Sequence, residues 1–311
     1  MSVFGTPNYR TFLGSRGIIA GSGPQGPGYL DTIQSIQMSV FAADAVDFGE
    51  LTIARYGEGG STGTRVLMPG VGSSPPDADR IDYINVVTPG DGVDFGELGS
   101  RGGQSVSGRY ATAPDGVRCA MAGGGGPTAN IQTIDYFNMN TIGGGAVNFG
   151  LLNQGPNAEW DGKAGGSDGY RGSAGGGNPP QTTINVFNIG VPGDAEDFGE
   201  LAQGNIFYGS EAATDGSRLV QCSGYAGGAT KFDTIQYYNI SNHRGTAMDF
   251  GEMFATRASS GVLSDGSLAL HCGGNGGTET VGFFRIGFPG NSLDYAELAA
   301  DSASQCTQSG G

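Results

Sequence analysis

Positive charge is scarce in this sequence. Lysine and arginine together number 15 in a chain of 311 residues, against 30 aspartates and glutamates, and the formal net charge is −15. Contact with the phosphate backbone of nucleic acid needs clustered cations, so we expect no nucleic-acid partner. An acidic surface of this kind mainly keeps a protein soluble and dispersed.

Histidine and cysteine, the usual ligands of transition metals, are also rare. A copper redox centre needs several imidazole and phenol ligands at one site, and the only histidines are His243 and His271. No Cys-x-x-Cys pair and no metal-ligand spacing occurs among the four cysteines, Cys119, Cys222, Cys272 and Cys306. We predict no metal and no cofactor, and cysteines that serve as small buried apolar residues.

Long apolar runs are missing as well. No run of 18 or more apolar residues occurs, and Met1–Leu13 lacks the basic-then-apolar pattern of a signal peptide. We therefore expect a soluble chain that is synthesised in a cytoplasm and is not inserted into a membrane.

Glycine, in contrast, is abundant, and one phrase recurs. Glycine makes up 61 of 311 residues, about 20 % against a usual ~7 %. The phrase Asp-Phe-Gly-Glu-Leu, or a close variant, occurs six times at intervals of 45 to 54 residues and ends near residues 51, 98, 152, 201, 253 and 298. Its first two residues are Asp47-Phe48, Asp94-Phe95, Asn148-Phe149, Asp197-Phe198, Asp249-Phe250 and Asp294-Tyr295. A repeat of about 50 residues is typical of one type of β-propeller blade.

Each repeat also contains the signals of a hairpin and of further strands. Asp-Gly pairs at Asp115, Asp168, Asp215 and Asp265 precede a short apolar strand, and Asp-Gly between apolar runs predicts a tight hairpin. Five of the six strands begin with an arginine: Arg16, Arg65, Arg118, Arg171 and Arg218, with Leu268 in the sixth place. A third strand alternates large apolar residues, as in Ile134-Asp-Tyr136-Phe137, and the repeated phrase supplies the fourth. The sequence predicts an all-β, six-bladed propeller of four-stranded blades.

The two ends of the chain complement each other. Residues 299–311 resemble the first strand of a repeat, and Ser15–Ala20 supplies the strand that would follow it. We predict that strand 304–308 pairs with strand 16–20 and closes the ring, so that residues 14–311 form one propeller. Residues 1–13 are left over as an amino-terminal arm with apolar side chains, which we expect to dock on the ring or on a neighbouring subunit.

The repeats resemble known families. Glycine pairs such as Gly123-Gly124 after the second strand and an aromatic third strand are similar to those of kelch and galactose-oxidase-like propellers. Kelch units carry a Trp where this chain has phenylalanine or Tyr295, so the likeness is loose. The residue sequences of 134–138, 193–201 and 215–218 resemble kelch-like repeats in virion proteins of tailed bacteriophages more closely. That resemblance implies a structural or attachment role and carries no catalytic motif.

The repeated carboxylates are the first candidates for chemistry. A catalytic carboxylate pair needs one site whose environment separates two pKa values, whereas these groups recur evenly around a ring. We interpret the aspartates as turn caps and the glutamates as lying on a solvated or paired face. The repeat lacks the glutamate at Leu151 and lacks the arginine at Leu268, so an obligatory arginine–glutamate pair is not expected. The acidic loop 77–79 could bind calcium, although a solvated turn is the better interpretation.

Residues 153–180 depart most from the repeat. They contain the single tryptophan, Trp160, with Asp161, Lys163 and Tyr170, and exposed aromatic loop residues are common in binding sites on rigid scaffolds. The alternative is that Trp160 fills a gap between blades.

Two functional hypotheses follow. The first is a non-enzymatic structural or interaction protein of a phage virion, located on the tail, a fibre or the capsid. Its partners would be other virion proteins in multiple copies and a host-surface glycan or protein. The second is a carbohydrate-binding lectin or a glycan-active propeller enzyme.

Overall fold

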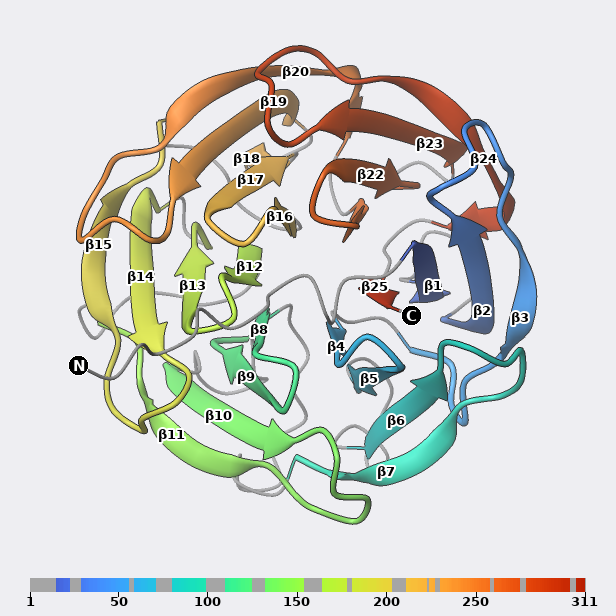
Figure 1. Ribbon diagram of the computed structural model, residues 1–311, viewed down its shortest axis with the longest axis horizontal. Coiled ribbons are helices and arrows are strands. Elements are labelled where there is room, and N and C mark those ends of the chain that lie inside the picture. Colours follow the sequence, from blue (N-terminus) through green and yellow to red (C-terminus); the bar gives the residue numbers. More distant parts are fainter. Residues whose placement is uncertain are drawn as a thin grey trace, which may run out of the picture.

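The protein is an all-β ring (Figure 1). The computed structural model describes residues 15–22, 29–55, 59–70, 80–98, 110–124, 132–153, 164–177, 181–202, 211–222, 224–226, 230–257, 260–274, 278–302 and 306–310. Within these ranges the chain forms six antiparallel sheets arranged around a central axis, which is the predicted six-bladed β-propeller. Each sheet is one blade, and its strands run in order from the axis to the outer wall.

The blades are numbered along the chain. Blade one holds β25 (Cys306–Gly310), β1 (Arg16–Ser22), β2 (Leu30–Gln37) and β3 (Val46–Glu50); blade two holds β4 (Gly60–Ser61), β5 (Arg65–Pro69), β6 (Arg80–Asn85) and β7 (Val93–Glu97). Blade three holds β8 (Ala111–Pro114), β9 (Arg118–Ala122), β10 (Thr133–Asn138) and β11 (Val147–Leu151); blade four holds β12 (Ala164–Ser167), β13 (Arg171–Gly175), β14 (Thr183–Asn188) and β15 (Glu196–Glu200). Blade five holds β16 (Glu211–Thr214), β17 (Arg218–Cys222), β19 (Thr230–Asn239) and β20 (Met248–Arg257), with the short β18 (Tyr225–Ala226) paired to β19; blade six holds β21 (Gly261–Ser264), β22 (Leu268–Cys272), β23 (Thr278–Arg285) and β24 (Leu293–Ser302).

The two ends of the chain close the ring, as the sequence predicts. β25 pairs antiparallel with β1, and Ile18 lies opposite Gln308. The carboxyl-terminal strand extends two residues further along the chain than predicted, because pairing runs from Cys306 to Gly310. The amino-terminal arm, residues 1–13, lies outside the described residues, and its docking stays a prediction.

The hydrophobic core lies between blades rather than within one blade. Leu67 and Phe95 of blade two pack in one buried cluster with Cys119 and Phe137 of blade three, and the same arrangement repeats around the ring. The phrase aromatic of each blade contacts the third-strand aromatic of the next blade in four places, for example Phe250 and Phe284 with ring centroids 5.4 Å apart. The burial of the repeated Phe therefore joins neighbouring blades.

The glycine of the repeated phrase is explained by the next blade. Its backbone approaches the loop between the third and fourth strands of the following blade, so a Cβ on Gly150 would lie 2.1 Å from the carbonyl oxygen of Gly193. The corresponding loop of blade two bonds to the outer strand of blade one, where the Phe48 and Glu50 carbonyls accept the N–H groups of Gly90 and Gly92. The outermost strand of each blade is thus covered by its neighbour, which protects an edge that could otherwise recruit another chain.

The interpretation of the phrase aspartates as turn caps is wrong. Asp47, Asp94, Asp197, Asp249 and Asp294 are exposed residues inside the outer strands. The capping side chain belongs to the loop of the next blade instead: Asp91 accepts the Glu50 N–H at 3.1 Å, and Asp194 accepts the Leu151 N–H at 2.9 Å. The phrase aspartate follows an exposed residue such as Val46 and is itself exposed, so its carboxylate points to water.

Candidate functional site

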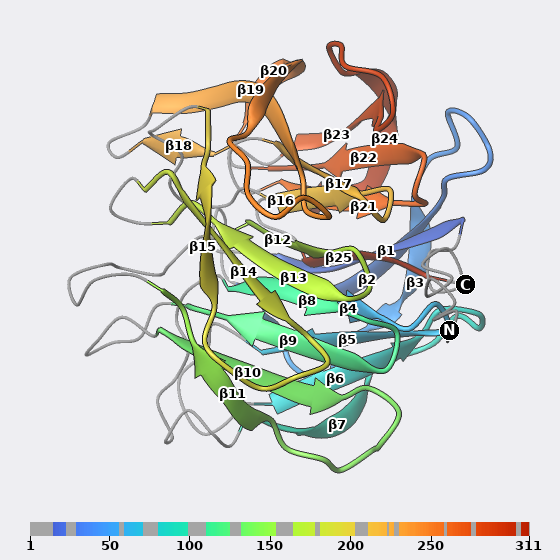
Figure 2. The ribbon, with the colours of Figure 1, turned by 60° about the vertical axis from the view of Figure 1, so that its left-hand side comes forward.

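One face of the ring carries two kinds of turn. The hairpins between the first and second strands lie beside the loops between the third and fourth strands of the following blade, and we call this side the turn face (Figure 2, right-hand side). Each Asp-Gly hairpin is fixed by its aspartate, as when Asp215 Oδ1 accepts the N–H groups of Ser217 and Arg218 at 2.9 and 2.7 Å. The following Gly216 has a φ of +89°, which glycine adopts without strain. The predicted hairpins are therefore confirmed.

The repeat arginines join this face together. Arg16, Arg118, Arg171 and Arg218 each donate a hydrogen bond from Nη1 to a main-chain carbonyl in the third-to-fourth-strand loop of the next blade. The Arg218–Ile286 bond is 2.7 Å long, and the Arg218 guanidinium also lies 4.9 Å from the centre of the Tyr237 ring. These arginines thus bond to backbone rather than to the repeat glutamates, in line with the expectation that an arginine–glutamate pair is not obligatory.

A second set of contacts between blades is buried, and the sequence analysis missed it. The third strand carries a buried polar side chain that accepts the N–H of the residue directly after the phrase in the preceding blade. These acceptors are Asp82 for Thr52, Asn185 for Asn153, Gln236 for Ala202 and Gln34 for Ala299. Arg55 forms a buried ion pair with Asp82 at 3.1 Å. The polar residue after the first Ile of five third strands was the available signal, but its partner lies in another repeat.

In blade six two side chains together provide the acceptor for the N–H that follows the phrase of blade five. Gly282 stands at the acceptor position, and the ring of His271 fills the space beside it: a Cβ on Gly282 would lie 2.3 Å from that ring. His271 Nε2 lies 2.9 Å from Ser292 Oγ, which accepts the Phe254 N–H at 2.9 Å. Burial, with a smaller contribution from the charge of Arg257, lowers the pKa of His271 from its usual 6.5 to about 3. The imidazole is therefore neutral at physiological pH and serves as part of the blade contact.

The described ranges contain neither a candidate metal cluster nor a membrane-spanning helix. No group of three or more His, Cys, Asp or Glu side chains in these ranges could hold a metal ion. The described part of the chain is all strand and turn, and it contains no helix that could span a membrane. Cys119, Cys222 and Cys272 form no disulfide and are buried, as predicted. The loop 77–79 lies outside the described residues.

No protein-family model matches the sequence. A comparison with curated proteins also finds no relative.

The tips of the turn-face loops are apolar. Five of the six third-to-fourth-strand loops expose a large hydrophobic side chain: Phe41, Val87, Ile142, Val191 and Phe288. Phe288 is 74 % exposed and Phe41 is 68 % exposed, which is unusual for phenylalanine on a monomer. Blade five is the exception, since Ser241, Asn242, His243 and Arg244 are the exposed residues of its loop. We call the five apolar side chains the apolar tips.

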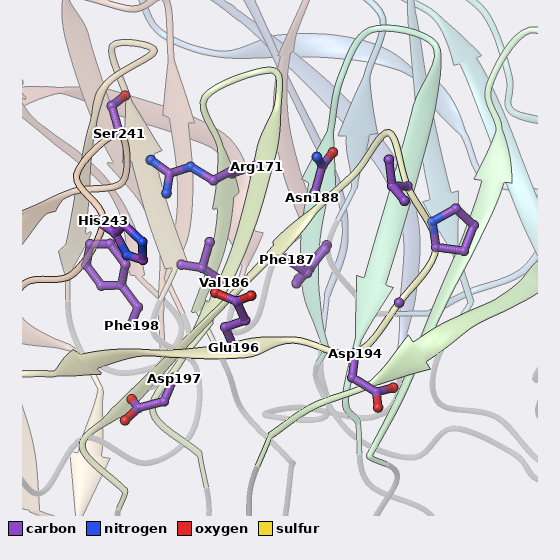
Figure 3. A pocket seen from close by; sticks show the side chains of 13 residues that line it. Arg171, Val186, Phe187, Asn188, Asp194, Glu196, Asp197, Phe198, Ser241 and His243 are labelled. Carbon is purple, nitrogen blue, oxygen red and sulfur yellow. The ribbon is translucent and has the colours of Figure 1, made fainter.

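A pocket of about 550 Å³ opens where blade four meets the polar loop of blade five (Figure 3). Its walls combine apolar side chains, Val186, Phe187 and Phe198, with polar groups that include Arg171, Asn188, Glu196 and His243. Arg171 donates to the Asn242 carbonyl at 2.9 Å, and this bond holds the two blades together beside the pocket. The sequence analysis did not find this pocket, because its residues come from two different repeats.

The predicted binding residues fall partly beside it. Trp160, Asp161 and Lys163 lie outside the described residues. Tyr170 is exposed at the tip of the blade-four hairpin, where its hydroxyl accepts a hydrogen bond from Asn188 Nδ2 at 3.1 Å. Tyr170 therefore contacts a residue of the pocket wall.

Proposed function

We propose that this chain is a non-enzymatic interaction protein of a phage virion, a rigid disc on the tail, a fibre or the capsid that docks through its turn face. The observation that carries the docking role is the ring of five apolar tips at equivalent positions of five blades. Single exposed hydrophobic residues are ordinary, but a repeated set on one face is typical of a contact surface. The virion itself is suggested by the resemblance of the repeats to those of phage virion proteins.

The regularity of the ring supports a structural role. An enzyme on a propeller concentrates different polar residues at one place, whereas the arginine bonds, the buried acceptors and the apolar tips of this chain recur blade by blade. Several weak contacts made at once by one rigid disc give a strong attachment, because each further contact forms within the same complex. Other virion proteins in multiple copies are the partners that suit such a surface.

Host contact would be short-range in this proposal. A net charge of −15 is repelled by an anionic cell envelope within the Debye length, about 8 Å at physiological salt. Attachment to a host glycan or protein would then depend on a few loops or on many copies.

The test uses particles that assemble without this protein. The double variant Phe41→Ser, Phe288→Ser removes the two largest apolar tips. We expect roughly a hundredfold to ten-thousandfold loss of affinity for the particle, since each buried phenylalanine contributes about 1.5–3 kcal/mol. The matched control is Leu30→Ser, Leu151→Ser. It removes two exposed apolar residues that lie at the strand ends away from the turn face. Normal incorporation of the tip variant, or equal loss with the control, would contradict docking through the turn face.

The alternative is a lectin or a glycan-active enzyme, and the pocket between blades four and five favours the lectin. A polysaccharide turnover that depends on Asp161 or Trp160 would support the enzyme instead. Replacement of each by Ala, with release of reducing sugar as the readout, distinguishes them.

A further inference from the structure

The pocket between blades four and five arises from one changed pair of residues. In each blade one residue of the third strand lies directly opposite the first residue of the fourth strand. Both members of this pair are large and apolar in four blades: Tyr83–Val93, Tyr136–Val147, Tyr237–Met248 and Phe283–Leu293. Blade one has Ser35–Val46. Blade four has Val186–Glu196, so an aromatic ring is missing and a carboxylate stands where the other blades have an apolar side chain.

In blade four no aromatic ring stands at this third-strand position beside the repeat arginine. In blades two and five the tyrosine of this pair lies under the repeat arginine, with Arg65 5.6 Å from the Tyr83 ring centre and Arg218 4.9 Å from that of Tyr237. Val186 is too short to cover Arg171 in this way, and both residues line the pocket. The guanidinium is still held in place by its bond to the Asn242 carbonyl. A flat face is therefore left for a ligand ring to occupy the space of the missing tyrosine.

The chemistry of the walls selects the ligand. Arg171 and Asn188 offer donors, Glu196 offers acceptors, His243 can do either, and Val186 gives an apolar wall. An anionic ligand would be repelled by Glu196 and by the net charge of −15, and a cationic group has no acceptor for the donors of Arg171 and Asn188. A neutral ring that carries several hydroxyl groups and one apolar face satisfies all of these groups. The volume of about 550 Å³ lies within the usual range of small-ligand sites.

Three acidic residues line the pocket, Asp194, Glu196 and Asp197, and their carboxylates lie on different sides of β15. Figure 3 shows the Glu196 carboxylate on the Val186 side of β15, whereas the carboxylates of Asp194 and Asp197 lie on the other side of the strand. Neighbouring strand residues point to opposite faces, which separates Glu196 from Asp197. Asp194 precedes β15, and its carboxylate accepts the Leu151 N–H of blade three. Hydrolysis of a glycosidic bond generally uses two carboxyl groups that flank the bond, and the arrangement of these three residues supplies one. The pocket is therefore suited to binding.

We propose that this pocket binds one neutral sugar ring, with Val186 providing its space and Glu196 and Arg171 its hydrogen bonds. This inference goes beyond the docking role of the turn face. It does not depend on the virion proposal, because it concerns the isolated protein.

The experiment is ligand-observed NMR of the purified full chain with D-glucose, D-galactose, D-mannose and N-acetyl-D-glucosamine. We expect the native protein to bind at least one of them. Val186→Tyr restores the ring found in other blades and should abolish binding, and Glu196→Gln should weaken it by about tenfold. Glu50→Gln, at an exposed glutamate of blade one, is the control and should bind as the native protein does. Circular dichroism and the melting temperature check that each variant is folded.

Three results would overturn the proposal. They are the absence of binding for all four sugars, unchanged binding by Val186→Tyr, and binding of a charged probe, Nα-acetyl-lysine amide or sialic acid, in place of a neutral sugar. Particle incorporation through the apolar tips is a separate measurement, so failure of the sugar test leaves the docking proposal standing.

Discussion

At the scale of single residues, Ser292 in contact with His271 takes the place of the hydrogen-bond acceptor that four other blades provide from the third strand. Gln34, Asp82, Asn185 and Gln236 each accept the N–H that follows the preceding phrase, and in blade six Ser292 does so while in contact with His271. The cost of this solution is a titratable group that is fully buried.

The stability of the ring should consequently depend on pH through His271. The folded protein keeps the imidazole neutral, with a pKa of about 3 against 6.5 when unfolded, so the unfolded state takes up the extra proton as pH falls below 6.5. The free energy of unfolding should drop by about 1.4 kcal/mol per pH unit in that window, down toward pH 3. Denaturant unfolding between pH 7 and pH 5 measures this slope.

His271→Gln isolates the effect. Glutamine retains a hydrogen-bonding side chain and does not titrate, so the variant should have a flatter profile between pH 6.5 and pH 5, where most carboxylates are still ionised. His243→Gln, at an exposed loop position, is the control and should keep the native profile. Parallel profiles for the native protein and His271→Gln would show that this residue is not the cause.

Two glycines test the contact between blades. Gly150 and Gly193 have no unusual φ, but a Cβ on Gly150 would lie 2.1 Å from the Gly193 carbonyl oxygen, and a Cβ on Gly193 meets nothing within 4 Å. Gly150→Ala should lower the free energy of unfolding by about 1–3 kcal/mol, because the backbone of the next blade must move. Gly193→Ala should change it by less than about 0.5 kcal/mol. Equal effects would mean that the approach of the two blades does not explain the phrase glycine.

At the scale of strands and loops, the molecule depends on contacts between successive blades, and one of these contacts closes the ring. Blade six bonds to blade one through Glu297, whose N–H and carbonyl bond to Asp44 and Ala45. Blade one itself is completed by β25, whose register places Cys306 opposite Ala20.

Ala20→Cys should lock this closure. Directly opposed residues of antiparallel strands are close enough for a disulfide to Cys306, and the bond would hold β25 on β1 when the chain unfolds. We expect a higher melting temperature in the oxidised variant, reversed by a reductant. Ala20→Ser is the control and should show no redox dependence. A disulfide that forms without raising the melting temperature would indicate that the terminal strand is not the weak point of the ring.

The strands themselves could be predicted from the sequence because their signals are local. The apolar alternation, the Asp-Gly pairs and the positions of Arg65, Arg118, Arg171 and Arg218 coincide with observed strands and hairpins. The role of the phrase aspartate was predicted wrongly, since capping by Asp91 and Asp194 comes from the next repeat. The pocket could not be predicted for the same reason, because it depends on the register of Val186 with Glu196 and on a loop of blade five.

At the scale of the whole molecule, the disc has one face whose loop tips are apolar in five blades and polar in blade five. The apolar tips suit a partner that covers the turn face, and the polar loop beside the pocket marks the sector where a small ligand would bind. A rigid ring with a protected outer edge suits a component that must hold its shape inside a larger assembly.

The central claim, that the protein is a non-enzymatic component of a virion, is tested most directly by quantitative mass spectrometry of purified particles. The account predicts that the chain is present in multiple copies, in a fixed ratio to the major virion proteins, after extensive washing. Its absence from particles that are otherwise complete, together with soluble chain in the lysate, would contradict the account.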